Sequence, residues 1–283
     1  MLRMTLSLIV LALTQYLGAE NHKIQIMLTN PRTVSTAFEK SMMARGDHKV
    51  FHEPWVSSYM YHAGDIDVFS QLPPQELIEA KNYEEVKALI YRYAKQKPVF
   101  LKDMIWCMGE KILSDDELLA NPHVILTFLI REPALSIESF FLKGLQRMPL
   151  DKILEFTRDV FRHEDLVRIA KKYREIRGEW PVIVEAEDIC SRPHSAMKAF
   201  CQQVGIAYIP QALSWEEGMP EEWKHLASWH LDAADSKGFF VPKRDELKSR
   251  FSMVPKEYVS ILEEIYQEQK PFYDALQSMK GKE

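Results

Sequence analysis

Five short hydrophobic runs recur along the chain, separated by longer segments of mixed polarity. They cover residues 24–29, 48–52, 98–101, 124–130 and 182–185. The fourth run, VILTFLI, is apolar along its whole length, as expected for a strand that is buried on both faces of a parallel sheet. Strands that alternate with helices predict an α/β domain with a mainly parallel sheet.

The segments between these runs carry apolar residues at helical spacing, or begin with helix-start signals. Helices are expected over the following segments: 37–44, 56–62 (a helical turn), 74–96 (one or two helices), 114–119, 133–145, 150–177, 193–204 and 255–276. Residues 206–250 have no regular pattern, and we expect irregular structure there.

The first 23 residues differ from the rest of the chain. A short basic start, an apolar centre over 5–13 and small residues at Gly18 and Ala19 are typical of a secretory signal peptide. The apolar run is too short for a comfortable membrane span. We therefore expect a signal peptide over 1–19, a single α/β domain over 20–283, and export or entry into the secretory pathway. A hydrophobic N-terminal helix on a cytoplasmic protein is the alternative.

The composition narrows the possible function classes. With 46% hydrophobic and 27% charged residues, the chain has the composition of an ordinary globular protein. Its net charge of -5 disfavours binding of nucleic acid through a basic face. Cys107, Cys190 and Cys201 are widely spaced, so they indicate neither a metal site nor a disulfide framework, and we expect free thiols.

The first run leads into a polar loop and a helix, in the order Asn-Pro-Arg-Thr-Val-Ser-Thr over residues 30–36. A strand, a tight loop and a helix N-terminus aim several backbone N–H groups at one point, which favours anions and phosphate above all. Ser35 or Thr36 can cap the helix and donate to a phosphate oxygen, and Arg32 adds a permanent cation. A turn that only connects two elements is the alternative interpretation.

Polar residues also follow the other predicted strands. His52 with Glu53, Lys102 with Asp103, and Arg131 each stand at the end of a run. Ligands of open α/β sheets bind beyond the carboxyl ends of the strands, so we expect these residues on one rim with the loop. The loop lacks GxxxxGK[ST], and the fourth run ends in arginine rather than a magnesium-binding aspartate. A magnesium-dependent ATPase or kinase is therefore disfavoured.

Three motifs in order resemble the sulfotransferase superfamily. They are PRTVST after the first strand, Arg131 followed eight residues later by Ser139, and the block VIVEAEDICSRPHSAMKAFCQQVGI over 182–206. The resemblance covers about residues 24–210. It implies a three-layer P-loop-type α/β fold, the co-substrate 3′-phosphoadenosine 5′-phosphosulfate and no metal requirement. It also implies a carbohydrate or small-molecule acceptor.

The resemblance assigns the co-substrate to two groups of residues. The 5′-phosphosulfate would contact four residues of the first loop: Arg32, Thr33, Ser35 and Thr36. The 3′-phosphate would contact Arg131 and Ser139. Val34 departs from the pattern, because many members have glycine there, and Arg32 replaces the lysine of cytosolic members. The family's late basic loop has only a vague counterpart in Lys237, Lys243 and Arg244.

The same resemblance suggests the catalytic groups. Glu53 matches a glutamate that serves some carbohydrate sulfotransferases as base, and an attacking hydroxyl must lose its proton to such a group. His52 is the alternative base. Lys102 would neutralise leaving-group charge or bind the acceptor, and Arg32 would stabilise the charge that develops. Each of these residues could instead form a local ion pair, including Lys102 with Asp103 and Arg131 with Glu132.

The sequence thus predicts an enzyme that transfers a sulfuryl group from this nucleotide to a hydroxyl. A binding protein that kept the pocket and lost catalysis is the alternative from another class, and a phosphotransferase is a further one. The acceptor pocket is expected from residues 56–97 and 206–250. We expect Trp215, Trp223 and Trp229 to serve packing rather than a sugar platform.

Overall fold

The computed structural model describes residues 22–65, 69–239 and 250–282 of the chain. The signal peptide expected over 1–19 therefore lies outside the described residues and stays a prediction. Lys243 and Arg244 of the late basic loop also lie outside them.

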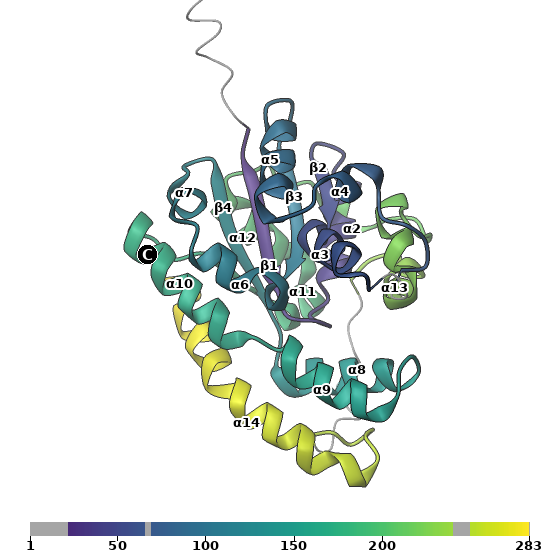
Figure 1. Ribbon diagram of the computed structural model, residues 1–283. Helices are drawn as coiled ribbons and strands as arrows, with labels where there is room; N and C mark the ends of the chain where they lie inside the picture. The colour runs from purple at the N-terminus through teal and green to yellow at the C-terminus, as the bar shows by residue number, and fades with distance from the viewer. Residues whose placement is uncertain (1–21, 66–68, 240–249, 283) are drawn as a thin grey trace, which may run out of the picture.

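Within the described residues, five parallel strands form one sheet in the order β2-β3-β1-β4-β5. The strands are β1 (Ile24–Thr29), β2 (Lys49–His52), β3 (Val99–Met104), β4 (Val124–Ile130) and β5 (Val182–Glu185). All five strands predicted from the hydrophobic runs are confirmed. Their shared direction brings the ends of β1, β2 and β4 to the same edge of the sheet (Figure 1).

The third strand is longer than predicted. We expected Lys102 and Asp103 just beyond its carboxyl end, but both lie inside β3 and are fully buried. Lys102 pairs in register with His52 of β2. Burial of the Lys102 ammonium costs free energy unless neighbouring acidic or polar groups pair with it. The side chains around Lys102 must therefore compensate its charge.

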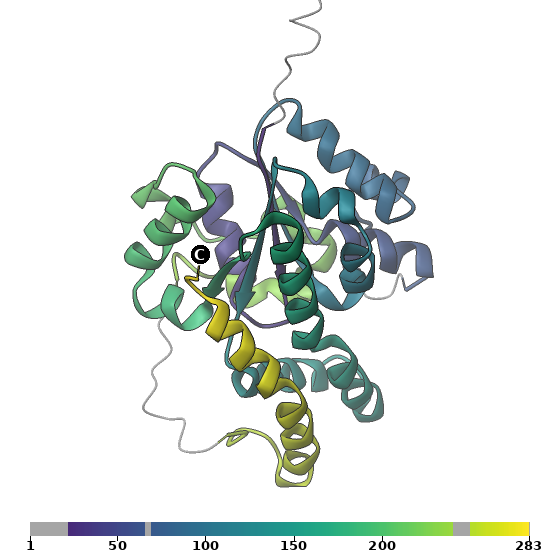
Figure 2. The ribbon, with the colours of Figure 1, turned by 90° about the vertical axis from the view of Figure 1, so that its left-hand side faces the viewer.

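Helices cover both faces of the sheet, as the view in Figure 2 shows. The helices before β5 are α2 (Ser35–Ala44), α3 (Pro54–Ala63), α4 (Gln75–Glu79), α5 (Tyr83–Ala94), α6 (Ile105–Leu113), α7 (Asp116–Ala120), α8 (Pro133–Leu145), α9 (Leu150–Val160) and α10 (His163–Arg177). After β5 come α11 (Ala186–Ser191), α12 (Pro193–Val204), the 3₁₀ helices η2 (Pro210–Leu213) and η3 (Glu221–Leu226), α13 (Ala227–Ala234) and α14 (Lys256–Met279).

The side chains of β1 alternate between the two faces, as the strand geometry requires. Ile26 and Leu28 belong to the core that packs under α5, α6 and α10. Met27 belongs to the opposite core, with Phe38 of α2 and Phe200 of α12. The arrangement is the three-layer P-loop-type α/β fold that the resemblance implied.

Several helical segments differ from the prediction. The helix α6 was missed, because it begins at Ile105, directly after the last residue of β3, with no intervening loop. The stretch 150–177 is two helices, since Phe161 and Arg162 have non-helical backbone. The turn expected at 56–62 is the full helix α3. The segment expected to be irregular contains the regular helix α13.

A third hydrophobic cluster lies beside the sheet and joins α8, α9 and α14 through aromatic side chains, among them Phe140, Phe141 and Phe161. In Figure 1 the helix α14, in yellow, runs along α10, which it contacts. None of the helices in the described part of the chain combines the length and apolarity needed to cross a membrane.

Candidate functional site

The loop between β1 and α2 has the backbone of an anion-binding turn. Arg32 (φ 61°) and Val34 (φ 67°) both adopt the left-handed conformation, and Val34 is the N-cap of α2. Such turns point successive N–H groups to one side, where the helix dipole adds to them. For a β-branched residue this conformation costs about 1–2 kcal/mol. The backbone at Val34 thus has the left-handed conformation that glycine adopts most readily, although the residue is a valine.

Arg32 brings together the residues predicted to hold two phosphates. Its Nε donates to Ser139 Oγ at 3.0 Å, and its backbone oxygen accepts from Arg131 Nη1 at 2.7 Å. Asp232 of α13 pairs with Arg32 Nη2 at 3.1 Å. Arg131 and Ser139, predicted as a pair from sequence, thus meet through the first loop. Asp232 was not predicted.

The hydroxyl residues of the loop divide into two groups. Thr33 is buried, donates to Asn30 O at 3.2 Å and contacts Thr29 Oγ1, so its hydroxyl is bound within the turn. Ser35 and Thr36 line a cavity, together with Arg32 and Arg131. The structure therefore places three of the four loop residues predicted for the phosphosulfate at the cavity.

The cavity has a volume of about 660 Å³, which is within the usual range for small-molecule sites. One group of lining residues, which we name the polar wall, consists of Arg32, Val34, Ser35, Thr36 and Arg131. A second group, which we name the aromatic wall, consists of Met60, Met104, Trp106, Phe140, Phe156 and Trp229. Phe140 stacks on Trp229 with the ring centroids 5.6 Å apart.

Glu53 connects the cavity to a buried cluster of ionisable groups. It follows β2, has a left-handed backbone (φ 44°), and lines the cavity although its side chain is almost fully buried. Lys102 Nζ donates to Glu53 Oε1 and lies 3.7 Å from Glu39 Oε2. A non-glycine residue held in the left-handed region is frequent at functional sites. Lys102 does not line the cavity and is fully buried.

Two of the local ion pairs considered as alternatives, Lys102 with Asp103 and Arg131 with Glu132, are replaced by other contacts. Glu53 and Arg32 do form ion pairs, with Lys102 and Asp232 respectively. Asp103 accepts from the backbone N–H groups of Trp55 at 2.7 Å and Met104 at 2.8 Å, while Lys102 pairs with the two glutamates. Glu132 caps α8 by accepting from the N–H of Ala134 at 2.6 Å. Lys102 therefore pairs with acidic residues of the buried cluster, and Arg131 donates to the backbone of the first loop.

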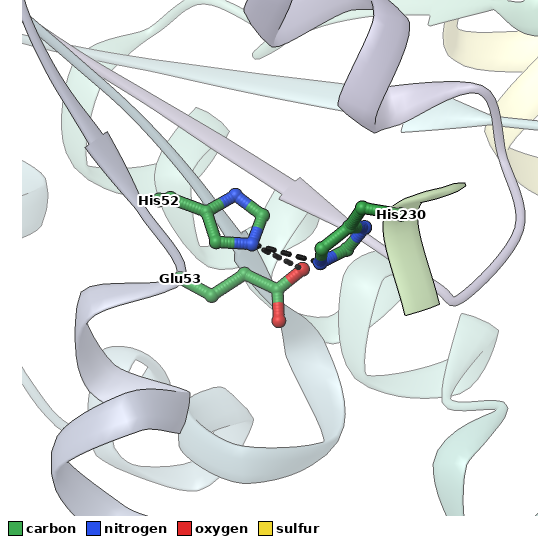
Figure 3. A group of neighbouring side chains, drawn as sticks. All are labelled: His52, Glu53 and His230. Atoms are coloured by element: carbon green, nitrogen blue, oxygen red, sulfur yellow. Dashed lines mark hydrogen bonds and ion pairs between the residues drawn. The ribbon is translucent and has the colours of Figure 1, made fainter. Parts of the chain in front are cut away.

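His52 lies behind Glu53 in the same cluster. Its Nδ1 is 2.8 Å from Glu39 Oε2, and its Nε2 is 2.9 Å from Nε2 of His230 and 3.8 Å from Glu53 Oε1 (Figure 3). Trp223, which is fully buried, donates its indole N–H to Glu39 Oε1 at 2.8 Å. His230 of α13 reaches Thr36 Oγ1 with its Nδ1 at 3.3 Å and lines the cavity.

Burial dominates the electrostatics of this cluster. It raises the pKa of Glu39 to about 7, against the opposing charge of Lys102. It lowers the pKa of His52 to about 3 and that of His230 well below its usual value. Both imidazoles are therefore neutral near pH 7. A base with so low a pKa, outside the cavity lining, is a poor match for the catalytic role that we considered for His52.

The sequence did not predict several residues of this site. Glu39 carried a usable signal, because it is a charged residue on the buried face of a short helix. His230 stands in a segment without a regular pattern, so nothing in the sequence indicated its role. Trp223 packs as expected, whereas Trp229 lines the cavity.

The fold and this site define an α/β protein of the P-loop type, with an anion-binding type of turn at the N-terminus of α2. A family model described as a sulfotransferase domain matches residues 23–279. The chain belongs to the sulfotransferase family, and sulfotransfer is the general activity that this membership supports. The match includes α14, beyond the 24–210 of the motif resemblance.

Individual relatives are distant. Branched-chain-amino-acid aminotransferase-like proteins 2 and 1 of Arabidopsis thaliana are 24% identical over 222 residues and 23% identical over 225 residues. Each match covers 76% of this chain, which spans about a third (36%) of each relative. Among solved structures, the sulfotransferase domain from the curacin biosynthetic pathway has a TM-score of 0.50 and 13% identity. It covers 88% of this chain and 98% of its own, and shows the fold alone.

Proposed function

We propose that this chain transfers a sulfuryl group from 3′-phosphoadenosine 5′-phosphosulfate to the hydroxyl of a small, largely apolar acceptor. One observation carries the proposal: the polar wall, Glu53 and the aromatic wall line the same cavity. An anion site, a carboxylate and an apolar surface thus lie together, as transfer from a nucleotide to an organic hydroxyl requires.

The polar wall would hold the donor. The N-terminus of α2 and the hydroxyls of Ser35 and Thr36 would bind the 5′-phosphosulfate. Arg131 and Ser139 would bind the 3′-phosphate. Ser139 accepts a hydrogen bond from Arg32 and can still donate its own O–H, so it can bind both Arg32 and a phosphate oxygen.

Glu53 would act as the general base. The acceptor oxygen attacks sulfur, its O–H proton passes to the Glu53 carboxylate, and the bond from sulfur to the bridging oxygen breaks. The products are a sulfate ester and 3′-phosphoadenosine 5′-phosphate, and charge on the departing phosphate is stabilised by Arg32 and the α2 N-terminus. Lys102 contacts Glu53 but not the cavity, so it would position the carboxylate rather than bind the acceptor.

The aromatic wall favours an apolar acceptor over a polyanionic sugar chain. Its six residues offer aromatic rings and thioethers but no cation. Three charged residues of α9 line the cavity: the acidic Glu155 and Asp159, and Lys152, whose ammonium lies 3.7 Å from Glu155. Together they are net negative, which disfavours an anionic carbohydrate, whereas a phenol or a similar compound would bury its ring.

The test is a turnover assay with the nucleotide donor and two acceptors of contrasting polarity, 2-naphthol and glucose. We expect release of 3′-phosphoadenosine 5′-phosphate that depends on 2-naphthol and is much slower with glucose. Nucleotide binding without any acceptor-dependent release, over a broader panel of phenols and alcohols, would overturn transfer as the function.

One observation favours a second candidate, a nucleotide-binding protein without transfer activity. The Val34 side chain lines the cavity beside the anion loop, where glycine would leave more room for a phosphate. Such a protein would bind the nucleotide and release none of it as product. A phosphotransferase is less well supported, because β4 ends next to Arg131 rather than a magnesium-binding carboxylate.

A further inference from the structure

Two imidazole nitrogens from distant segments approach each other beside a carboxylate. His52 Nε2 and His230 Nε2 are 2.9 Å apart, and Glu53 Oε1 is 3.8 Å from His52 Nε2. The three ligand atoms lie within 4.8 Å of one another (Figure 3). Two bare ring nitrogens at this distance would repel, so either one imidazole carries an Nε2–H that donates to the other, or a metal ion takes the place of that proton.

We propose that His52, Glu53 and His230 form a site for a divalent transition metal of the zinc type. Two imidazoles and one carboxylate are a ligand set that zinc accepts, whereas magnesium and calcium prefer oxygen. In tetrahedral zinc sites the ligand atoms are about 3.3 Å apart, given bonds of about 2.0–2.1 Å. Two of the observed separations, 2.9 Å and 3.8 Å, lie on either side of this value and the third is within 4.8 Å, so metal binding would require side-chain rotations that close the three atoms around the ion.

The surroundings already orient both imidazoles. Glu39 Oε2 is 2.8 Å from Nδ1 of His52, and Thr36 Oγ1 is 3.3 Å from Nδ1 of His230. Metal-binding histidines commonly use the second ring nitrogen in this way, which fixes the ring and leaves the other lone pair for the metal. Because Glu53 and His230 line the cavity, the ion would keep a coordination position open to a water or an anion.

Lys102 is the cation in contact with this cluster, and it limits the affinity. Its ammonium contacts Glu53 Oε1, so a metal would share the carboxylate with it. A carboxylate has two oxygens and about four lone-pair sites, so it can serve both cations. Two carboxylates, Glu39 and Glu53, surround this one ammonium. We therefore expect reversible binding rather than a permanently held ion.

A metal at this site would oppose the proposed catalysis. A divalent cation on the Glu53 carboxylate would strongly lower its basicity, so Glu53 would be a poor acceptor for the proton of the acceptor hydroxyl. The ion would thus be an inhibitor and not a cofactor, and a chelator would restore activity. This consequence rests on the proposed function, whereas the metal site itself does not.

The test measures binding without reference to activity. The full chain is treated with a chelator, dialysed and titrated with Zn²⁺ by calorimetry, and Co²⁺ is added separately to record its visible absorption. We expect one ion per chain, tetrahedral Co²⁺ bands and no competition from Mg²⁺. In His230→Gln the Zn²⁺ affinity should fall at least about tenfold, and in Glu39→Gln, which removes the carboxylate that holds Nδ1 of His52, it should fall about 10- to 100-fold. His62→Gln, at an exposed histidine of α3, is the matched control and should bind like the wild type.

Thermal unfolding without metal checks that each variant is folded. If His230→Gln does not fold, Glu53→Gln replaces it, since an amide of the same shape is a poor zinc ligand. Wild-type protein without measurable Zn²⁺ binding, or cluster variants that bind as well as the wild type, would overturn the site and leave a shared proton between the imidazoles. Zinc that binds but does not inhibit would contradict Glu53 as the base and leave the metal site standing.

Discussion

The polar wall and the aromatic wall of the cavity are built in different ways. The polar wall comes from the ends of β1 and β4 and the first turn of α2, so the sheet itself fixes its position. The aromatic wall is assembled mainly from the faces of α3, α6, α8, α9 and α13. In the proposed function, donor binding would therefore depend on the sheet and the loops at its edge, and acceptor choice on the helices that pack beside it.

Glu53 lines the cavity together with residues of both walls, and its replacement should have the largest effect. In Glu53→Gln we expect the rate of sulfuryl transfer to fall about 100- to 10,000-fold, because a general base contributes that much. Affinity for 3′-phosphoadenosine 5′-phosphate should be retained, which titration calorimetry measures. Glu117→Gln, at an exposed position of α7, is the control. A variant that keeps its transfer rate would place the base elsewhere.

The polar wall should account for nucleotide affinity. Combined replacement by alanine of Arg131, in the polar wall, and of Ser139, which is bonded to Arg32 but lies outside the cavity lining, would remove the two proposed hydrogen bonds to the 3′-phosphate, about 3 kcal/mol or 100-fold in Kd. The matched double variant, Arg192→Ala with Ser195→Ala, changes two exposed residues at the start of α12. Unfolding without ligand shows whether loss of the Arg131 bond to Arg32 O disturbs the loop. Unchanged affinity in a folded variant would remove both residues from the nucleotide site.

The aromatic wall should account for acceptor affinity alone. Trp229→Ala should raise the KM for 2-naphthol about tenfold, since a buried aromatic contact contributes roughly 0.5–1.5 kcal/mol beyond its area. Nucleotide affinity should stay the same, because the Trp229 contact to Arg32 uses the backbone oxygen. Trp180→Ala, a tryptophan outside the cavity lining, serves as control. Equal losses for nucleotide and acceptor would show that the two walls are not separable.

Val34 should give the smallest effect. Val34→Gly removes the cost of a left-handed β-branched residue, and the entropy of glycine offsets part of the gain. We expect a net stabilisation of up to about 1 kcal/mol, or roughly 2–4 °C in Tm. The nucleotide Kd should improve a few-fold, about 1 kcal/mol or less. Val34→Ala keeps the β-carbon and should show less stabilisation. A destabilised glycine variant would mean that Val34 packing outweighs its strain.

The sequence predicted the elements whose signals are local. The five strands are hydrophobic runs, and the anion loop is one contiguous segment, so both could be read from neighbouring residues. The pairing of Arg131 with Ser139 also follows from spacing along one strand and one helix. The sequence predicted that Arg131 lies at the same edge of the sheet as the first loop. It did not predict the contacts that Arg32 makes with Arg131 and Ser139, because the order of the strands was unknown.

The rest of the site depends on contacts between distant residues. Lys102 looked like a residue beyond a strand end, since an isolated lysine gives no sign of full burial between two glutamates. His230 meets His52 across 178 residues of sequence, from a helix that no periodic pattern indicated. Such pairings follow from how α13 packs on α2, which local sequence does not encode.

The proposed two-phosphate site is tested most directly by comparing two ligands that differ by one phosphate. Thermal unfolding is followed with 3′-phosphoadenosine 5′-phosphate and, at the same concentration, with adenosine 5′-phosphate. At about one hundred times its Kd the first should add roughly 2.7 kcal/mol, a Tm shift of about 5–10 °C. Adenosine 5′-phosphate should shift the Tm far less, because it leaves Arg131 and Ser139 without a phosphate. Equal shifts, or none with either ligand, would contradict a two-phosphate site at the end of this sheet.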